Sequence, residues 1–491
     1  WLASEDPWQT LAACIELVDA VDSGDPENFV SHLHVHQDGT CNGLQHYAAL
    51  GRDFEGGRQV NLVPGDHPMD VYSAVLDVVE VSVRRDAANG HEMAQLLVGK
   101  LKRKVIKQTV MTNVYGVSMY GAREQVMARL KEIVDPQTGA PLFTDRGQLL
   151  KLATYLAHRV FESLGEIFEC ARQIQDWLNE AASRIARSLP PESVKLRKEL
   201  ARLRAKQLRL AHSTIKTKTK AKAKTESTDE TNTKSVDQAN TNTKSTDETE
   251  TETKTKAKST TRPDLSDIDS SKVKTSLQQR KKHLIDQISS QPLASVTWTT
   301  PLNLIIVQPY RKLVTKAISS SLQYVSLVNE DLPSPVNSQK QKTAFPPNFV
   351  HSLDASHMLL SAIQCKVNGI VFSSVHDSYW THACDIDMMN NILREQFVAL
   401  HQKNILTELR DEFMLRYKDY LIPVNTTKVS QNNTSNLTSK SKHDYSLDYD
   451  HNADKIKLTS KISYIPFDLP PLPPTGTLDI NSVLDSKYFF S

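Results

Sequence analysis

Two aspartates, Asp38 and Asp377, each follow a segment with the residue pattern of a β-strand. Residues 29–36, FVSHLHVH, alternate apolar side chains with histidines, which predicts a half-buried strand that ends at Asp38. Residues 368–383, NGIVFSSVHDSYWTHA, predict two short strands joined at a His-Asp pair, with Asp377 at the tip of the hairpin. Two carboxylates far apart in the sequence therefore both stand at strand ends.

Such a pair suits two Mg²⁺ ions about 4 Å apart, which stabilise the attacking and leaving oxygens of a phosphoryl transfer. Mg²⁺ takes oxygen ligands and keeps several waters, so Asp38, Asp377, the main-chain carbonyl of Gly39 and substrate phosphates suffice as ligands. Taken singly, each aspartate has a plainer interpretation, Asp38 as a helix cap and Asp377 as a turn residue. The two aspartates alone leave both interpretations open.

A basic stripe is the third chemical feature. In residues 99–121, GKLKRKVIKQTVMTNVYGVSMYG, Arg103 and Lys107 are one helical turn apart, and Tyr115 lies two turns beyond Lys107 near the same face. A guanidinium and an ammonium on one face suit a triphosphate, and the ammonium can donate a proton to departing pyrophosphate. The alternative is a solvated basic helix face with a core tyrosine.

These segments resemble motifs of a known family. DGTCNGLQHYAALGRD, RKVIKQTVMTNVYG and HDS occur in the order of motifs A, B and C of the single-subunit, bacteriophage-type RNA polymerases, with the mitochondrial members most similar. Residues 346–360, PPNFVHSLDASHMLL, are similar to a further signature of the family. The resemblance implies an α+β, mostly α, fold: a right-hand polymerase palm and fingers with a small antiparallel palm sheet and long disordered insertions.

The resemblance also implies a role for each site residue. Asp38 and Asp377 resemble the two metal-binding aspartates of a site with two Mg²⁺ ions, and the Gly39 carbonyl resembles a further ligand. The other nucleotide-binding positions are Arg103 and Lys107 for the triphosphate, with Lys107 as general acid, Tyr115 for selecting ribose, and His351 for contacting the sugar from the other side. The final YFFS resembles an aromatic C-terminus that packs close to the active site.

By the same resemblance the chain divides into six parts. They are 1–75 (palm with motif A), 76–190 (fingers), 191–292 (charged helices around a low-complexity insertion), 293–424 (promoter-reading region and palm with motif C), 425–460 (a polar insertion) and 461–491 (the C-terminal tail).

The two insertions are read from composition. Residues 213–262 are nearly all Thr, Lys, Ser, Asp, Glu, Asn and Ala, and they cannot bury enough apolar surface to offset the entropy of ordering, so we expect disorder there. Charged helices are expected on both sides, at 190–212 and 270–290. Residues 425–445 form a second polar insertion, and 309–343 correspond to the promoter-reading region of the family.

Bulk composition restricts the alternatives. The 491 residues include 59 Lys and Arg against 57 Asp and Glu, a net charge of +2, so nucleic-acid binding cannot be argued from net charge. Five cysteines without CxxC spacing indicate reduced thiols rather than disulfides or zinc, and no apolar run is long enough to span a bilayer. The chain begins in what looks like folded material, and we expect it to lack its natural N-terminus and any targeting segment.

The resemblance further implies partners and a place. We expect a DNA template and promoter, nascent RNA, NTPs and mitochondrial transcription factors as partners, and the mitochondrion as location. A related family A-like DNA polymerase is one alternative; such enzymes carry Glu after His-Asp, whereas Ser378 stands here and favours ribonucleotides. An inactive or truncated polymerase-like nucleic-acid-binding module is the other.

The histidines near these motifs have separate interpretations. His32, His34 and His36 alternate on one strand face and can ligate zinc, but a solvated or locally hydrogen-bonded face is the simpler interpretation because no fourth ligand is evident. His376 beside Asp377 is expected to position the hairpin or to contact the primer end.

Overall fold

The computed structural model describes most of the chain, namely residues 1–4, 6–134, 140–226, 270–290, 294–313, 315–328, 334–426 and 461–490. The chain divides into two compact units. The first unit is Trp1–Leu189, Leu293–Val328 and Ser334–Ser491, and the second unit is Pro190–Pro292 and Asn329–Pro333.

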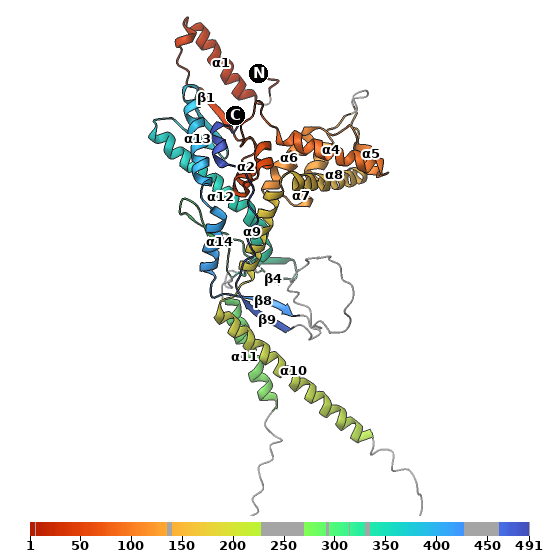
Figure 1. The fold of residues 1–491 in the computed structure, drawn as a ribbon. Helices are drawn as coiled ribbons and strands as arrows, with labels where there is room; N and C mark the ends of the chain where they lie inside the picture. The colour runs from red at the N-terminus through yellow and green to blue at the C-terminus, as the bar shows by residue number, and fades with distance from the viewer. Residues whose placement is uncertain are drawn as a thin grey trace, which may run out of the picture. The chain divides into compact units, whose positions relative to one another are not determined.

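The first unit is mostly helical with small antiparallel sheets, as the sequence predicts (Figure 1). Its α-helices are α1 (Pro7–Asp22), α2 (Asn42–Gly51), α3 (Phe54–Gln59), α4 (Val71–Ala88), α5 (Glu92–Leu97), α6 (Arg103–Val114), α7 (Met119–Leu130), α8 (Arg146–Ile167), α9 (Glu169–Arg187), α12 (Ser338–Val367), α13 (Ile386–His401) and α14 (Ile405–Arg416). Short 3₁₀ helices are η1 (Pro26–Asn28), η2 (Ala383–Asp385) and η3 (Ile480–Asp485). No helix among the described residues has the length and apolar character that crossing a membrane requires.

One sheet has three strands and the others have two. The three-stranded sheet has the order β1 (His34–Asp38), β7 (Ser378–His382), β6 (Ser373–Val375). The two-stranded sheets are β2 (Thr297–Thr299) with β3 (Ile305–Val307), β4 (Thr315–Ser319) with β5 (Tyr324–Val328), and β8 (Leu421–Thr426) with β9 (Lys461–Pro466). Every strand pairing among the described residues is antiparallel.

The first strand is shorter at its start than its sequence pattern predicts. Alternation begins at Phe29, but β1 begins at His34 and ends at Asp38. The pairing explains this, because β7 offers five partners, from His382 opposite His34 to Ser378 opposite Asp38. Strand length therefore follows the partner, whereas the predicted end of the strand is confirmed.

Helices α4 to α8 form a group that lies to one side of the three-stranded sheet in Figure 1. Side chains cap several of them: Asp70 accepts from the Tyr72 amide at α4, Ser118 from Gly121 at α7, and Asp145 from Gln148 at α8. Helices α8 and α9 are separate, because the backbone leaves helical geometry at Phe168 (φ −117°, ψ 54°).

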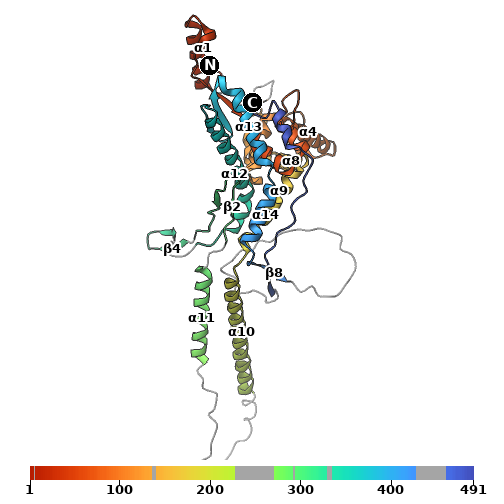
Figure 2. The same cartoon turned by 60° about the vertical axis from the view of Figure 1, so that its left-hand side comes forward.

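Helix α12 packs along α9 and also against α2 and α13 (Figures 1 and 2). Aromatic side chains hold α12 in place. Phe345 and Phe349 both lie edge-on to Trp298 of β2, with ring centroids 5.2 and 6.4 Å away. The Trp298 indole N–H donates to the Ser352 hydroxyl over 3.1 Å. These contacts hold the helix that carries His351.

The second unit contains α10 (Pro191–Glu226) and α11 (Ser270–Ser290), which pack against each other and share an ion pair, Arg280 to Glu199 at 2.7 Å. The expected helix at 190–212 therefore continues to Glu226, into the segment expected to be disordered. Extending a formed helix costs far less than starting one, and this stretch is rich in lysine, which favours helix. The rest of that segment and residues 427–445 of the second insertion lie outside the described residues.

The C-terminal tail is built into the first unit next to Asp38. Phe490 forms an antiparallel bridge with Gly39, and the side chain of Gln45 on α2 donates to the Phe489 carbonyl over 3.0 Å. Phe489 and Phe490 are buried, and the Phe490 ring stacks on Tyr379 of β7 with centroids 5.2 Å apart. The tail thus supports β1 and β7 together.

We expect Phe490→Ala to lower the free energy of unfolding by about 3–5 kcal/mol, because it removes a buried ring that contacts both strands. Chemical denaturation followed by circular dichroism measures this. Leu484→Ala is the control, since Leu484 is 45% exposed and its loss should change stability by about 0.5 kcal/mol or less. Equal effects of the two substitutions would contradict a supporting role for the tail.

Candidate active site

Asp38 and Asp377 lie at the same end of the three-stranded sheet, Asp38 as the last residue of β1 and Asp377 in the loop between β6 and β7. Asp38 is paired with Ser378, the residue after Asp377, and opposite residues in antiparallel strands have Cα atoms about 5 Å apart. Val375 also pairs with Ser378, so His376 and Asp377 form a two-residue hairpin loop. His376 has φ 55°, the left-handed region that such tight loops require and that side chains other than glycine rarely adopt.

Both carboxylates are free of protein cations. In the part of the chain that the structure describes, no side chain forms a hydrogen bond or an ion pair with Asp38 or Asp377. The negative charge of Asp377 acts on residues from three other elements: it raises the pKa of the Cys41 thiol, where burial is the larger cause, and it acts likewise on Tyr115 and Asp354. Asp377 therefore lies close enough to all three residues for its charge to affect their pKa values.

Tyr115 and His351, predicted from separate segments, stack on each other with ring centroids 4.6 Å apart and an interplanar angle of 12°. The turn after α6 makes this possible. Gly116 has φ 74°, and a Cβ there would lie 3.2 Å from the Pro347 side chain, so α12 comes too close for a larger residue. Burial, then the charge of Asp377, raises the pKa of the Tyr115 hydroxyl, which stays protonated at neutral pH.

The two residues of the basic stripe, Arg103 and Lys107, both lie over the ring of Tyr72. The Arg103 guanidinium lies 4.8 Å and the Lys107 ammonium 5.9 Å from the centre of the Tyr72 ring. Burial, and after it the nearby thiol of Cys41, three residues after Asp38, raise the pKa of the Tyr72 hydroxyl. Arg103 is already engaged: its Nε and Nη2 donate to the Asp70 carboxylate over 2.6 and 3.1 Å. Lys107 is exposed and forms no ion pair among the described residues. The candidate site thus combines acidic side chains, two basic side chains and the stacked rings of Tyr115 and His351.

The comparisons with known proteins agree with this arrangement. The profile of the family described as DNA-dependent RNA polymerase matches residues 1–491. The chain belongs to the phage-type, single-subunit family of RNA polymerases. Because the chain belongs to this family, it is not a member of the family A DNA polymerases.

Individual relatives are similar over most of the chain. The mitochondrial DNA-directed RNA polymerase of Schizosaccharomyces pombe is 39% identical over 100% of the chain and 32% of its own length. That of Neurospora crassa is 41% identical over 88% of the chain and 26% of its length, and that of Homo sapiens is 38% identical over 85% and 25%. The chain therefore spans about a third or less of these relatives.

Asp354 is a site residue that the sequence argument missed. It lies on α12 one turn after His351, and it accepts a hydrogen bond from the side-chain amide of Asn42 at the start of α2. Burial, followed by the charge of Asp377, raises the pKa of the Asp354 carboxyl to about 6. The three-residue spacing from His351 was a signal for it, because residues i and i+3 share a helix face.

Buried histidines connect α2 to two neighbouring helices. His46 Nδ1 and His401 Nε2 are 2.8 Å apart, and His357 Nε2 lies 2.9 Å from the Leu393 carbonyl. Burial lowers the pKa of His357 to about 4 and that of His401 to about 3, so both rings are neutral at pH 7. These histidines join α2, α12 and α13.

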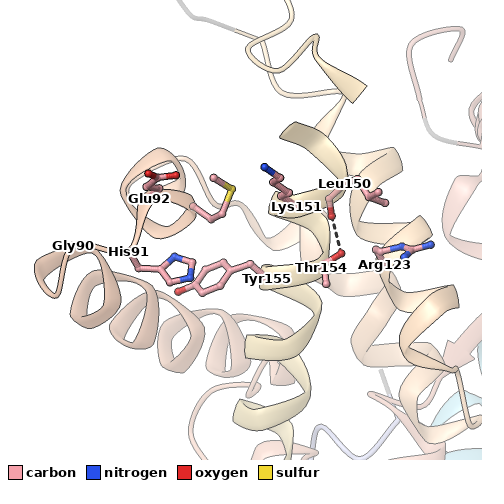
Figure 3. Close-up of a pocket in the computed structure, with 9 residues that line it drawn as sticks. Gly90, His91, Glu92, Arg123, Leu150, Lys151, Thr154 and Tyr155 are labelled. Atoms are coloured by element: carbon pink, nitrogen blue, oxygen red, sulfur yellow. Dashed lines mark hydrogen bonds between the residues drawn. The ribbon is translucent and has the colours of Figure 1, made fainter. Parts of the chain in front are cut away.

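The pocket in Figure 3 lies elsewhere, between α5, α7 and α8, with a volume of about 760 Å³. His91 stacks on Tyr155 at 4.6 Å, and the Tyr155 hydroxyl donates to Asp86 over 2.5 Å. Arg123 and Lys151 also line it. None of the residues predicted for the site lies in this pocket, so the candidate chemistry sits on the sheet and helix surface around Asp377.

We expect Asp354→Asn to stabilise the protein at pH 7 when divalent cations are removed with a chelator. A carboxyl whose pKa rises from its ordinary 3.8 to about 6 on folding costs stability as pH rises through that range, and asparagine does not ionise. The expected gain is up to about 3 kcal/mol at pH 7 and vanishes near pH 4. Denaturation curves from pH 4 to 8 measure it.

Asp387→Asn is the matched control, because Asp387 is exposed on α13 and its substitution should leave the pH dependence unchanged. A gain for Asp354→Asn that persists at pH 4 would show that the charge of Asp354 is not its cause.

Proposed function

We propose that this chain carries the catalytic centre of a DNA-templated RNA polymerase that acts in mitochondrial transcription. It adds NTPs to an RNA 3′ end by two-metal nucleotidyl transfer. In this proposal the three-stranded sheet with α2 and α12 is the palm, and α4 to α8 are the fingers. The observation that carries it is the meeting of Asp38 and Asp377 beside the Tyr115–His351 stack.

The residues present fit Mg²⁺. The described residues contain no group of three or more His, Cys, Asp or Glu side chains placed to hold a metal ion. Two carboxylates without protein cations nevertheless favour a cation, because Mg²⁺ completes its shell with water and phosphate oxygens. Beside them is a third carboxyl, Asp354, whose pKa is raised by burial and then by the charge of Asp377. Asp38, Asp377 and the Gly39 carbonyl would hold the two ions. Held there, the ions would supply Lewis-acid activation for the RNA 3′-OH and positive charge for the phosphates.

The protein groups around the pair would position the nucleotide. The Tyr115–His351 stack offers a flat surface with a protonated hydroxyl, which suits contact with a ribose. Lys107 is free to bind the triphosphate and to donate a proton to pyrophosphate as it leaves. Arg103 would leave Asp70 to bind the β- and γ-phosphates; both partners are over a third exposed, so their ion pair is worth about 1 kcal/mol or less.

The partners follow from this function. They are template and promoter DNA, nascent RNA, NTPs and mitochondrial transcription factors. Within the segment 309–343, which the family resemblance assigns to promoter reading, β4 and β5 form a hairpin whose β4 residues are all exposed. The mitochondrial location rests on the names of the relatives, which include mitochondrial polymerases of two fungi and of man.

We expect Asp377→Asn to abolish primer extension, by a factor of about 10³ or more, while the fold remains intact. The substitution removes one of the two negative charges that hold the ions, and the geometry of the loop is kept. A labelled RNA primer on a DNA template, extended with rNTPs or with dNTPs at physiological Mg²⁺, measures it.

Asp66→Asn is the control, because Asp66 is an exposed aspartate outside the site. Activity retained in Asp377→Asn would rule the mechanism out. NTP binding without elongation by the unsubstituted chain would instead favour the alternative of an incomplete polymerase-like binding module.

Asp70→Asn tests the movement of Arg103. Asparagine keeps the cap of α4 but removes the charge that competes with the triphosphate, so we expect the KM for NTP to fall severalfold with little change in kcat. Steady-state extension at varied NTP concentration measures both constants. A higher KM would mean that Asp70 orients Arg103 for the substrate rather than competing with it.

A further inference from the structure

Three rings of the three-stranded sheet lie flat against one another. His34, His36 and Trp380, here called the ring cluster, have centroids 4.5 to 4.9 Å apart. The interplanar angles are 7°, 10° and 15°, so the rings are nearly parallel. His34 and His36 are exposed and Trp380 is half-buried, so the rings are open to solvent.

The ring cluster lies on the same face of the sheet as Asp38. Side chains two residues apart on a strand share a face, and Trp380 is the register partner of His36 just as Ser378 is the partner of Asp38. The opposite face is buried, because Tyr379 and Thr381 are 0% and 3% exposed. The ring cluster and Asp38 therefore form one continuous solvent-facing surface.

Its distance from the reacting end matches a few nucleotides. A strand rises about 3.3 Å per residue, so His36 lies about 7 Å and His34 about 13 Å from Asp38 along β1. Successive nucleotides of a helical strand rise about 3.4 Å. The ring cluster thus covers the distance from about the second to the fourth nucleotide behind a 3′ end placed at Asp38.

We propose that the ring cluster is the contact surface for the sugar–phosphate chain of the growing RNA, just behind its 3′ end. This rests on the proposed function, which places the 3′-OH at Asp38. Flat rings pack against ribose while the bases stay paired with the template, and imidazole N–H groups donate to phosphate oxygens or to the 2′-hydroxyl. The 2′-hydroxyl makes this surface favour RNA over DNA at the primer strand.

The experiment measures binding of an RNA–DNA hybrid in the absence of NTPs, by fluorescence anisotropy. We expect Trp380→Ala and the double substitution His34→Ala with His36→Ala to raise the Kd for the hybrid about tenfold, because each removes ring contacts and N–H donors to the sugar–phosphate chain. The loss should be smaller for a DNA–DNA duplex of the same sequence. Trp380→Phe, which keeps a flat ring, should restore most of the affinity.

Two controls separate this contact from a purely structural role. Trp8→Ala removes a tryptophan that is 77% exposed on α1 and should leave the Kd unchanged. Thermal unfolding followed by circular dichroism shows whether each variant keeps its fold. A Kd for the hybrid that is unchanged in folded variants would overturn the proposal, as would failure of the unsubstituted chain to bind the hybrid.

Photocross-linking decides which strand is touched. With 4-thiouridine at the third nucleotide from the RNA 3′ end we expect cross-links to β1 or β7; cross-links only from the template strand would overturn the proposal. Because no step requires nucleotide addition, a chain that binds the hybrid through these rings but does not extend it would refute the proposed function and leave the contact standing.

Discussion

The pairing of β1 with β7 is the constraint on which the candidate site depends. Five backbone partners set Asp38 opposite Ser378, and the two-residue loop then leaves Asp377 beside it. Strand side chains alternate between faces, so a slip of one residue would either turn Asp38 toward the core or turn Tyr379 out of it. Phe490 opposes such a slip, since it bridges to Gly39 and stacks on the buried ring of Tyr379.

The start of α2 connects this sheet to the helices that carry the other site residues. Asn42 donates to Asp354, and the two lie 312 positions apart in the chain. A Cβ on Gly43 would come within 2.3 Å of Val114, so α2 and the end of α6 touch without room for a side chain. Tyr115 follows directly and meets His351 on α12. One helix end thereby fixes the relative positions of three segments.

Within the described part of the chain, the candidate site is marked by its unpaired acidic side chains rather than by a pocket. Asp38 and Asp377 have no cationic partner among the described residues, while Arg103 is held by Asp70 on the other side of Tyr72. Asp354 is the acidic group whose ionisation the fold opposes: burial, followed by the neighbouring charge of Asp377, raises the pKa of its carboxyl.

The sequence by itself determined the local features: the strand ending at Asp38, the hairpin tip at Asp377, and the spacing of Arg103 and Lys107 on one helix face. These depend on residue periodicity and turn preference, which neighbouring residues control. Only the tertiary structure decided that Asp70 holds Arg103, that Asp354 stands beside Asp377, and that β1 begins at His34. Each of these depends on a partner distant in the chain, and packing rather than local pattern selects such partners.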